Sequence, residues 1–394
     1  MPSKATRLKI PAIRIDIMAK NKENANVCKP ITMIELRKLL LDNLKALWDG
    51  EFLKSKYSDA ARMIPPIMIW GAPGVGKSTI IRELAQELNI GFIDVRLAQR
   101  EPVDMRGLPV PENGAVKWLV SSEWPRDPAS KGIILFDELT AADKTLQVAS
   151  YEFILDRRLG DLYSVPPGWY IVAAGNRVED RAVSCAMSSA LANRFLHVEV
   201  QPDAASFLQW AGKNNVHQAV INFIRFRPEL LFSHDEADLQ RGWASPRSWE
   251  RVSTMLRIAE HNGNNSTLKF SIPGLVGNAA AIEFLAFYKN MFYTQFGRDI
   301  RDVMLAGQEI KIPDRPDRIY ACCGAIAYYF STESQDKQVK MVPSLLRFAL
   351  ALSNDYSQML MTDIFSKIGE GPCKQAIVSN PAYAEWLNKI GVRQ

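Results

Sequence analysis

The sequence has few of the features that define membrane, secreted or metal-bound proteins. Its 394 residues contain no run of about 18 uncharged apolar residues, so no membrane-spanning helix is predicted. The basic segment 1–22 lacks the apolar stretch of a secretory signal peptide. The cysteines are few and lack the spacing of a metal site, which favours free thiols in a reducing, cytoplasmic compartment. They are Cys28, Cys185, Cys322, Cys323 and Cys373.

Charge of one sign is not in marked excess either. The formal net charge of +5 is spread along the chain, and no dense stripe of lysine and arginine marks a nucleic-acid surface. A composition of 47% hydrophobic and 23% charged residues is typical of globular proteins. A chain of 394 residues is too long for one hydrophobic core, so we expect at least two domains.

What the sequence does have is a glycine-rich stretch between a short apolar run and a helical pattern. It fits G-x-x-x-x-G-K-[ST], the phosphate-binding loop known as Walker A, in the strand–turn–helix setting that this motif requires. Its glycines let the backbone wrap around a phosphate, and the N–H groups at the helix N-terminus face the anion. Lys77 can reach the β- and γ-phosphates, and the Ser78 hydroxyl can take a Mg²⁺ coordination position. The predicted nucleotide-binding residues are Gly71, Ala72, Pro73, Gly74, Val75, Gly76, Lys77, Ser78 and Thr79.

An apolar strand that ends in two acidic residues is the second chemical element. Residues 133–136 are continuously apolar, as expected for a strand buried on both faces of a parallel sheet. Asp137 and Glu138 follow at its carboxyl end, where open α/β sheets bind ligands. We predict that Asp137, the Walker B aspartate, holds Mg²⁺ directly or through water. Glu138 is predicted to polarise the attacking water as a general base.

Two further polar residues stand where they could act on a γ-phosphate. Asn176 follows the apolar run 169–174 after a single glycine, so its amide could reach between the γ-phosphate and the lytic water. Ser245 and Pro246 are a good N-cap and first residue of a helix, which places Arg247 in the first turn. The helix macrodipole disfavours a cation there, so Arg247 indicates an anionic partner. An ordinary turn asparagine and a solvated surface arginine are the alternatives.

Strand and helix patterns divide the chain into four parts. Strand signals fade after Gln201, and helical patterns take over. Five strands separated by helices predict a parallel sheet in an α/β domain, at 67–70, 91–97, 132–137, 169–174 and 196–200. The predicted parts are a flexible basic arm (1–30), a nucleotide-binding α/β domain (31–203), a helical lid (204–262) and a helical C-terminal region (263–394).

Smaller elements are predicted within these parts. Residues 32–48 form an amphipathic helix opened by a capping box. The Asn-Gly pair at 113–114 predicts a β-hairpin, and residues 160–169 predict a second one. Trp118 and Trp124 either contact a partner or pack the first hairpin against the domain.

The C-terminal third has helical patterns but no motif with a chemical role. We expect a connector at 262–275, where asparagine, glycine and serine are frequent. Helices are predicted at 279–296, 318–329 and 342–360, and their aromatic residues at helical spacing indicate a core rather than a ligand site.

Together these motifs resemble those of the AAA+ ATPases, and within them the MoxR-like branch, over roughly Ile67 to Arg257. Similar proteins carry a G-x-P-G-x-G-K-[ST] loop, an apolar strand ending in Asp-Glu and a sensor asparagine after the fourth strand. A Leu-x-x-Arg-Phe segment precedes the fifth strand, and a Ser-Pro-Arg lies in a helical lid. Here these motifs are Gly71–Ser78, Asp137-Glu138, Asn176, Leu191–Phe195 and Ser245–Arg247.

The resemblance implies a P-loop AAA+ domain with a five-stranded parallel sheet, followed by an all-α lid and a helical C-terminal region. It implies that the two hairpins are the inserts of this branch, that Arg194 is an arginine finger acting on a neighbouring subunit's nucleotide, and that Arg247 is the sensor-2 arginine. The family commonly has aspartate before the finger, and Asn193 stands here, which puts a subunit contact in doubt. The predicted catalytic residues are Glu138, Asn176, Arg194 and Arg247, and the predicted metal ligands are Ser78 and Asp137.

The function that this resemblance implies is that of an ATPase using ATP and Mg²⁺. It is expected to form a ring, a hexamer, that remodels or activates a protein partner in the manner of a chaperone. That partner often carries a von Willebrand A-type domain. The alternative is a nucleic-acid-associated motor, restriction- or translocase-like, which the basic N-terminal arm leaves open. Guanine specificity is not expected, because no Asn-Lys-x-Asp motif follows the Walker B strand.

Overall fold

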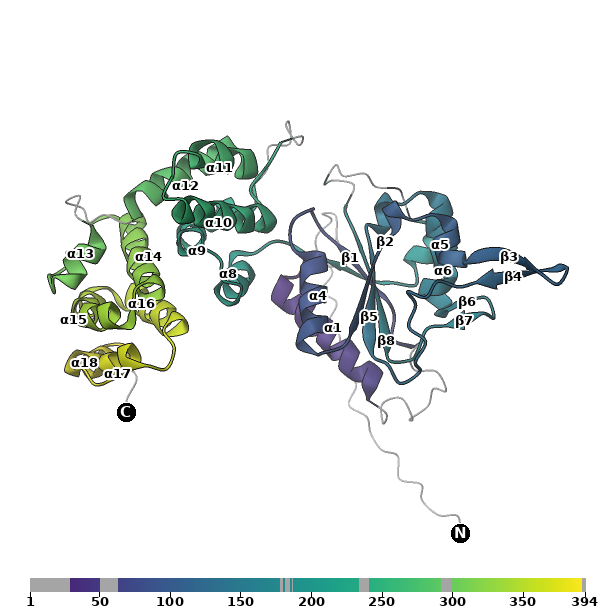
Figure 1. Cartoon of the computed structure of the whole chain (residues 1–394), viewed down its shortest axis with the longest axis horizontal. Helices are drawn as coiled ribbons and strands as arrows, with labels where there is room; N and C mark the ends of the chain where they lie inside the picture. The colour runs from purple at the N-terminus through teal and green to yellow at the C-terminus, as the bar shows by residue number, and fades with distance from the viewer. Residues whose placement is uncertain are drawn as a thin grey trace, which may run out of the picture.

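The computed structural model describes residues 29–49, 63–177, 180, 185, 187–233, 241–291 and 299–391. These residues form an α/β part built around one parallel sheet and a part made of helices only (Figure 1). The arm predicted at 1–30 lies almost entirely outside the described residues. None of the helices in the described ranges is long and apolar enough to span a membrane.

The sheet has five parallel strands in the order β2-β5-β8-β1-β9, which confirms the predicted five-stranded parallel sheet. Side chains alternate between the two faces of its central strands. On one face, Ile67, Ile133 and Val172 belong to one hydrophobic cluster. On the other, Met68 and Ile134 belong to a second. The strands are β1 (Ile67–Trp70), β2 (Gly91–Arg96), β5 (Gly132–Asp137), β8 (Trp169–Gly175) and β9 (Leu196–Glu199).

Helices cover both faces of the sheet (Figure 1). Helices α1 (Met33–Trp48) and α4 (Lys77–Glu87) bury their apolar residues in the cluster on one face. Helix α6 (Lys144–Asp156) does so on the other. The capping box predicted for α1 is present, because the Thr32 hydroxyl accepts from the Glu35 amide while the Glu35 carboxylate accepts from the Thr32 amide. The shorter elements are η1 (Leu97–Gln99), α5 (Pro102–Arg106), η2 (Leu139–Ala141) and α7 (Ser189–Ala192).

Two hairpins are present, as separate two-stranded sheets, and the first is the predicted one. In the first, β3 (Leu108–Glu112) and β4 (Ala115–Leu119) flank a tight turn, with Asn113 at φ 56° and Gly114 at φ 78°. Positive φ at both central residues matches the twist of the strands. The second was predicted at 160–169 but lies earlier and is shorter, pairing β6 (Arg158–Leu159) with β7 (Tyr163–Ser164). The first hairpin projects from the α/β part on the side away from the helical part (Figure 1).

The two tryptophans near the first hairpin have different surroundings. Trp124 is 2% exposed, and its ring centroid lies 4.4 Å from that of Phe153. Trp118, on β4, is 41% exposed. Of the two interpretations left open by the sequence, packing therefore applies to Trp124, whereas Trp118 is available to a partner.

The helical part shares one hydrophobic core, which extends in sequence from Phe207 to Trp386. This core crosses the predicted division between lid and C-terminal region at residue 262, and that division stays a prediction. The elements are α8 (Ala204–Lys213), α9 (Gln218–Phe226), η4 (Pro228–Leu231), α10 (Pro246–His261), α11 (Leu268–Val276), α12 (Asn278–Met291), α13 (Ile300–Leu305), α14 (Pro316–Thr332), α15 (Gln335–Ala351), α16 (Asn354–Lys367), α17 (Pro372–Val378) and α18 (Pro381–Lys389).

Two expectations for the helical part are wrong. The connector predicted at 262–275 contains α11, whose residues Leu268, Ile272 and Val276 are buried at helical spacing. Tertiary packing there overrides the low helix propensity of the surrounding glycine and proline. The single helix predicted at 342–360 is two helices, because the backbone is extended at Leu352 and Ser353 between α15 and α16.

Candidate active site

The predicted site residues gather at the edge of the sheet where its central strands end. Trp70, the last residue of β1, pairs with Gly175, the last residue of β8. In β5, Phe136 pairs with Ala173, so Asp137 ends this strand at the same edge. The Walker A loop follows β1, and Asn176 follows β8. Three segments far apart in the sequence are therefore brought together because they follow parallel strands in register.

The loop between β1 and α4 has the backbone of a phosphate cradle. Gly74 and Gly76 adopt φ values of 82° and 102°, a region that side chains disfavour. A Cβ on Gly71 would lie 2.8 Å from the carbonyl oxygen of Val200, which leaves no room for a side chain. Helix α4 begins directly afterwards at Lys77. The N–H groups of its first turn have no partners within the helix, so the loop and the helix together present donors to an anion.

Lys77 is held by three hydrogen bonds at the centre of this edge. The side chain is 8% exposed, and its Nζ donates to the carbonyl oxygens of Gly71 (2.6 Å) and Ala72 (3.1 Å). The third bond goes to Oδ1 of Asn176, at 3.1 Å. Burial lowers the pKa of Lys77 to about 8, and the charge of Asp137 acts in the opposite direction. The ammonium is therefore already directed towards the strand end that carries Asn176.

Ser78 and Asp137 form a second pair. Ser78 Oγ donates to Asp137 Oδ2 at 2.5 Å, and Oδ1 of Asp137 accepts from the amide of Glu138 at 2.9 Å. A hydroxyl and a carboxylate oxygen side by side are hard oxygen ligands of the kind that Mg²⁺ takes in nucleotide-binding proteins. The donor set therefore fits the predicted metal, with Ser78 and Asp137 as the residues that would hold it.

Glu138 stands at the turn that follows β5. Its backbone is left-handed, with φ 56° and ψ 32°, and its side chain is exposed. Such a conformation is uncommon for a residue with a long side chain and often occurs at functional sites. The chain turns here into η2, so Glu138 lies at the same edge of the sheet as Asp137.

The start of α10 lies directly on the Walker A loop. The amide of Arg247 donates to the carbonyl oxygen of Gly74 at 3.2 Å. A Cβ on Gly74 would lie 3.0 Å from Oγ of Ser245, the N-cap of this helix. The guanidinium of Arg247 is exposed beside the loop. The structure thus brings Arg247 to the other predicted site residues.

Arg194 is the one predicted catalytic residue that is not brought to this edge. It precedes β9, whose first residue, Leu196, pairs with Ile67 at the start of β1. The amide of Leu196 donates to the carbonyl oxygen of Pro66 at 2.9 Å. Arg194 therefore lies at the amino-terminal edge of the sheet, opposite the Walker A loop, and it is exposed there.

Some residues at the site were not identified from the sequence. Ile31 forms a parallel bridge with Val200, and Met33 places its Cε 3.6 Å from where a Cβ of Gly76 would lie. The segment before α1 therefore flanks the loop. Thr140 lies between the ends of β5 and β8, hydrogen-bonded to the backbone of Asn176. Contacts of this kind depend on the packing of distant segments, and no local motif indicates them.

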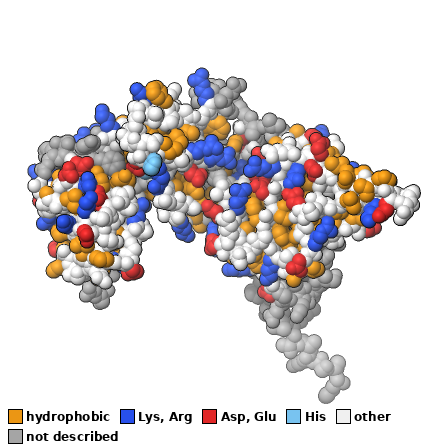
Figure 2. Space-filling model, viewed as in Figure 1, with side chains coloured by type: hydrophobic (Ala, Val, Ile, Leu, Met, Phe, Trp, Pro, Cys, Tyr) orange, Lys and Arg blue, Asp and Glu red, His pale blue; other side chains and the backbone are white. Residues whose placement is uncertain are grey.

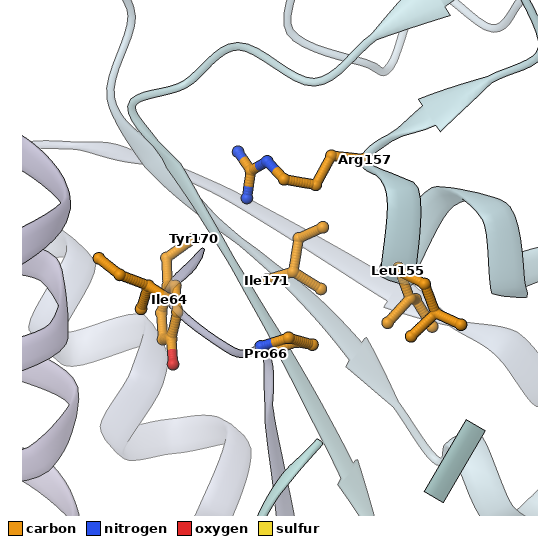
Figure 3. Close-up of a pocket in the computed structure, with 7 residues that line it drawn as sticks. Ile64, Pro66, Leu155, Arg157, Tyr170 and Ile171 are labelled. Atoms are coloured by element: carbon orange, nitrogen blue, oxygen red, sulfur yellow. The ribbon is translucent and has the colours of Figure 1, made fainter. Parts of the chain in front are cut away.

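A small pocket on the opposite edge of the sheet is structural. Figure 3 shows side chains of β8, of the segment before β1 and of the end of α6 around it. The Arg157 guanidinium donates to the carbonyl oxygens of Pro166 (3.0 Å) and Trp169 (2.7 Å). The Tyr170 hydroxyl donates to the carbonyl oxygen of Pro65. These polar groups tie chain segments together rather than converge on a ligand.

Comparison with solved structures gives matches of low identity. The RuvB Holliday junction branch migration motor of Thermotoga maritima is 16% identical, with 70% of this chain and 77% of that chain covered and a TM-score of 0.34. NtrX from Brucella abortus in complex with ADP is 14% identical over 86% of this chain and 70% of that chain, with a TM-score of 0.35. A putative ATPase from Cytophaga hutchinsonii ATCC 33406 is 13% identical over 86% and 96%, with a TM-score of 0.28.

No curated protein matches the sequence. Residues 67–181, however, match the family model described as "ATPase family associated with various cellular activities (AAA)". The matched segment contains the Walker A loop, Asp137, Glu138 and Asn176, while Arg194 and Arg247 lie beyond it. The match does not distinguish branches of the family, so the MoxR-like assignment stays a prediction. The chain carries an AAA-type ATPase domain, and the enzyme is an ATPase.

Proposed function

We propose that this chain hydrolyses Mg-ATP at sites shared between the subunits of a ring, expected to be a hexamer, and uses the cycle to remodel a protein partner. The position of Arg194 is the observation that carries the proposal. The strands β1 and β9 are each four residues long and lie side by side. At about 3.3 Å per residue, their two ends are roughly 13 Å apart. Arg194 precedes one end and the Walker A loop follows the other, so an arginine finger here serves a second copy.

Within one subunit, the remaining residues have complementary roles. Lys77 and the amides of the Walker A loop bind the phosphates, and Glu138 accepts a proton from the attacking water. Asn176 orients that water, and Arg247 reports on the γ-phosphate from α10. Ser78 and Asp137 would hold Mg²⁺, which would neutralise charge at the phosphates. An arginine finger contributes about 10³- to 10⁵-fold in rate at comparable sites, so an isolated subunit should hydrolyse ATP slowly.

The surface of the first hairpin supports a protein as the partner. Leu108, Val116, Trp118 and Leu119 are exposed apolar residues of β3 and β4. Figure 2 shows hydrophobic side chains gathered where Figure 1 places this hairpin. Exposed apolar surface of this kind indicates protein contact, whereas a nucleic-acid surface would be rich in lysine and arginine. A partner with a von Willebrand A-type domain is the one that resemblance to the MoxR-like branch implies.

The first experiment measures assembly and hydrolysis together. The particle mass of a Glu138→Gln variant with Mg-ATP should correspond to about six chains, the usual size of such a ring, because ATP stays bound between subunits. Wild-type specific activity should rise with protein concentration as the ring forms. A fully active monomer, with activity independent of concentration, would contradict the proposal.

Mixing two inactive variants tests the shared site directly. Glu138→Gln keeps its arginine, and Arg194→Ala keeps its glutamate, so a mixed ring contains sites with both groups intact. We expect activity to reappear on mixing, while each variant alone remains inactive. Arg318→Ala, which removes an exposed arginine of α14, is the matched control and should remain active. If mixing restores nothing, Arg194 does not act on a neighbour's nucleotide. Stimulation of hydrolysis by DNA or RNA, lost with salt, would favour a nucleic-acid partner instead.

A further inference from the structure

The side chain of Thr140 is buried between the ends of two strands of the active-site edge. Thr140 is 1% exposed and belongs to η2, the turn that follows Glu138. Its hydroxyl accepts a hydrogen bond from the amide of Asn176 at 3.3 Å. The same hydroxyl lies 3.5 Å from the carbonyl oxygen of Asn176, to which it donates. One side chain therefore meets both polar groups of the Asn176 backbone.

The neighbouring residue shows how closely this contact is fitted. A Cβ on Gly175 would lie 2.8 Å from both the Cγ2 and the Oγ1 of Thr140, and 2.6 Å from Cε of Met68. The end of β8 is thus confined between Thr140 and a core side chain of β1. Only glycine fits at position 175 next to Thr140, and the Thr140 hydroxyl contacts the peptide of the next residue, Asn176.

Further hydrogen bonds connect Thr140 and Asn176 to Lys77 and to the segment between Asn176 and Arg194. Oδ1 of the Asn176 side chain accepts from Lys77 Nζ at 3.1 Å. The carbonyl oxygen of Thr140 accepts from the amide of Cys185 at 2.6 Å. Cys185 lies between Asn176 and Arg194 in the sequence. Thr140 therefore touches the segments that carry the glutamate, the asparagine and the approach to the finger.

We propose that Thr140 is a positioning residue for hydrolysis: its hydroxyl holds the Asn176 peptide so that the amide side chain faces Lys77 and the bound phosphates. Thr140 acts through Asn176 and does not itself touch the substrate. The inference rests on the role proposed above for Asn176. It adds a residue that the Walker motifs do not include, and it is independent of ring size and of the partner.

Two variants separate the hydroxyl from the rest of the side chain. Thr140→Val keeps the shape of the side chain but removes the oxygen that accepts from the main-chain N–H of Asn176. We expect kcat for ATP to fall about 10- to 100-fold, as for other small misplacements of a catalytic group, with KM little changed. Thr140→Ser keeps the hydroxyl and should retain most of the wild-type kcat. Thermal unfolding and Mg-ADP binding check that each variant is folded. Thr140→Ala replaces Thr140→Val if the latter does not fold.

A double variant shows whether the effect passes through Asn176. Asn176→Ala alone should lower kcat, and adding Thr140→Val to it should lower kcat no further. Normal kcat in Thr140→Val, equal losses in Thr140→Val and Thr140→Ser, or full additivity with Asn176→Ala would each overturn the inference. If Asn176→Ala itself hydrolyses ATP normally, the role proposed for Asn176 fails, and the inference about Thr140 fails with it. If Asn176→Ala is impaired while Thr140→Val is not, only the inference about Thr140 fails.

Discussion

At the scale of single residues, the candidate site combines side chains that are held in place with side chains that are exposed. Lys77 is buried and donates three hydrogen bonds, and the Ser78 hydroxyl is bound to Asp137. Glu138 and Arg194 are exposed. The groups that we propose for binding phosphate and metal are therefore held by hydrogen bonds within the subunit. Under our proposal, the exposed pair acquires its partners from outside the subunit: water for Glu138 and another subunit's nucleotide for Arg194.

The pairing of Ser78 with Asp137 predicts a defect that depends on metal. Ser78→Ala removes one of the two oxygens that would hold Mg²⁺ and leaves Asp137 Oδ2 without its donor. We expect the Mg²⁺ concentration for half-maximal hydrolysis to rise by about tenfold or more, as when other groups around a bound metal are removed. Binding of ATP without Mg²⁺ should change little, because Lys77 and the loop amides remain.

Hydrolysis titrated with Mg²⁺ at fixed ATP, and nucleotide binding in the presence of a chelator, measure the two quantities. Ser366→Ala, at an exposed serine of α16, is the matched control. An unchanged Mg²⁺ requirement in Ser78→Ala would show that the hydroxyl does not contribute to the metal site.

At the scale of elements, the sequence predicts best where the local pattern and the fold agree. The central strands β5 and β8 are apolar on both faces and end in Asp137 and Gly175, so their position and the chemistry at their ends can both be predicted. Helix α11 was not predicted because the asparagine, glycine and serine residues of 262–275 indicate a connector, while burial of Ile272 against the shared core stabilises a helix. The break at Ser353 was missed because apolar residues continue at helical spacing across it.

Parts of the site could not be predicted because they depend on contacts between distant elements. The Walker residues can be identified from a single continuous motif. Thr140 becomes part of the site only because η2 meets the end of β8, which is a property of the folded sheet. For Trp118 and Trp124, the sequence leaves the role open, since both are apolar and adjacent to the same hairpin. Only the packing on Phe153 distinguishes them.

Substitution by alanine is therefore expected to change the free energy of unfolding much more at Trp124 than at Trp118. Trp124→Ala removes a buried ring packed on Phe153 and should lower the free energy of unfolding of the α/β part by about 3–5 kcal/mol. Trp118→Ala removes an exposed ring and should change it by less than about 0.5 kcal/mol. Urea unfolding of both variants measures the difference. Basal hydrolysis should survive in Trp118→Ala, while stimulation by a protein partner should decline. A large loss of stability in Trp118→Ala would mean that the hairpin packs against another part of the molecule.

At the scale of the whole molecule, the helical part contacts the site through its first helices, and a single hydrophobic core joins all of its helices. The amide of Arg247 contacts Gly74, and Trp210 Nε1 donates to the Glu83 carboxylate at 2.8 Å, which links α8 to α4. Beyond these contacts, one hydrophobic core extends from α8 to α18. A movement of α10 when the γ-phosphate leaves would therefore be passed to all of these helices rather than to a small lid alone.

An ion pair between α9 and α16 allows a test of whether these helices unfold together. Arg225 of α9 donates from both terminal nitrogens to Asp363 of α16, with Nη2 and Oδ1 2.8 Å apart. Both side chains are largely buried. Removing one partner of such a pair leaves the other charge without compensation and typically costs about 3–5 kcal/mol. The exposed pair of Arg315 and Asp317 should contribute only about 0–1 kcal/mol, so Arg315→Ala is a matched control.

If the helices from α8 to α18 unfold as one unit, the loss of stability in Arg225→Ala should extend beyond α16. We expect faster amide hydrogen exchange in α9 and α10 as well as in α16–α18, all by a similar factor, because exchange through a shared opening follows one free energy. The α/β part should keep its protection and its Mg-ADP binding, since its two hydrophobic clusters are separate from the helical core. Faster exchange confined to α16–α18 would show instead that α9 and α10 do not unfold together with the C-terminal helices, as a domain boundary near residue 262 requires.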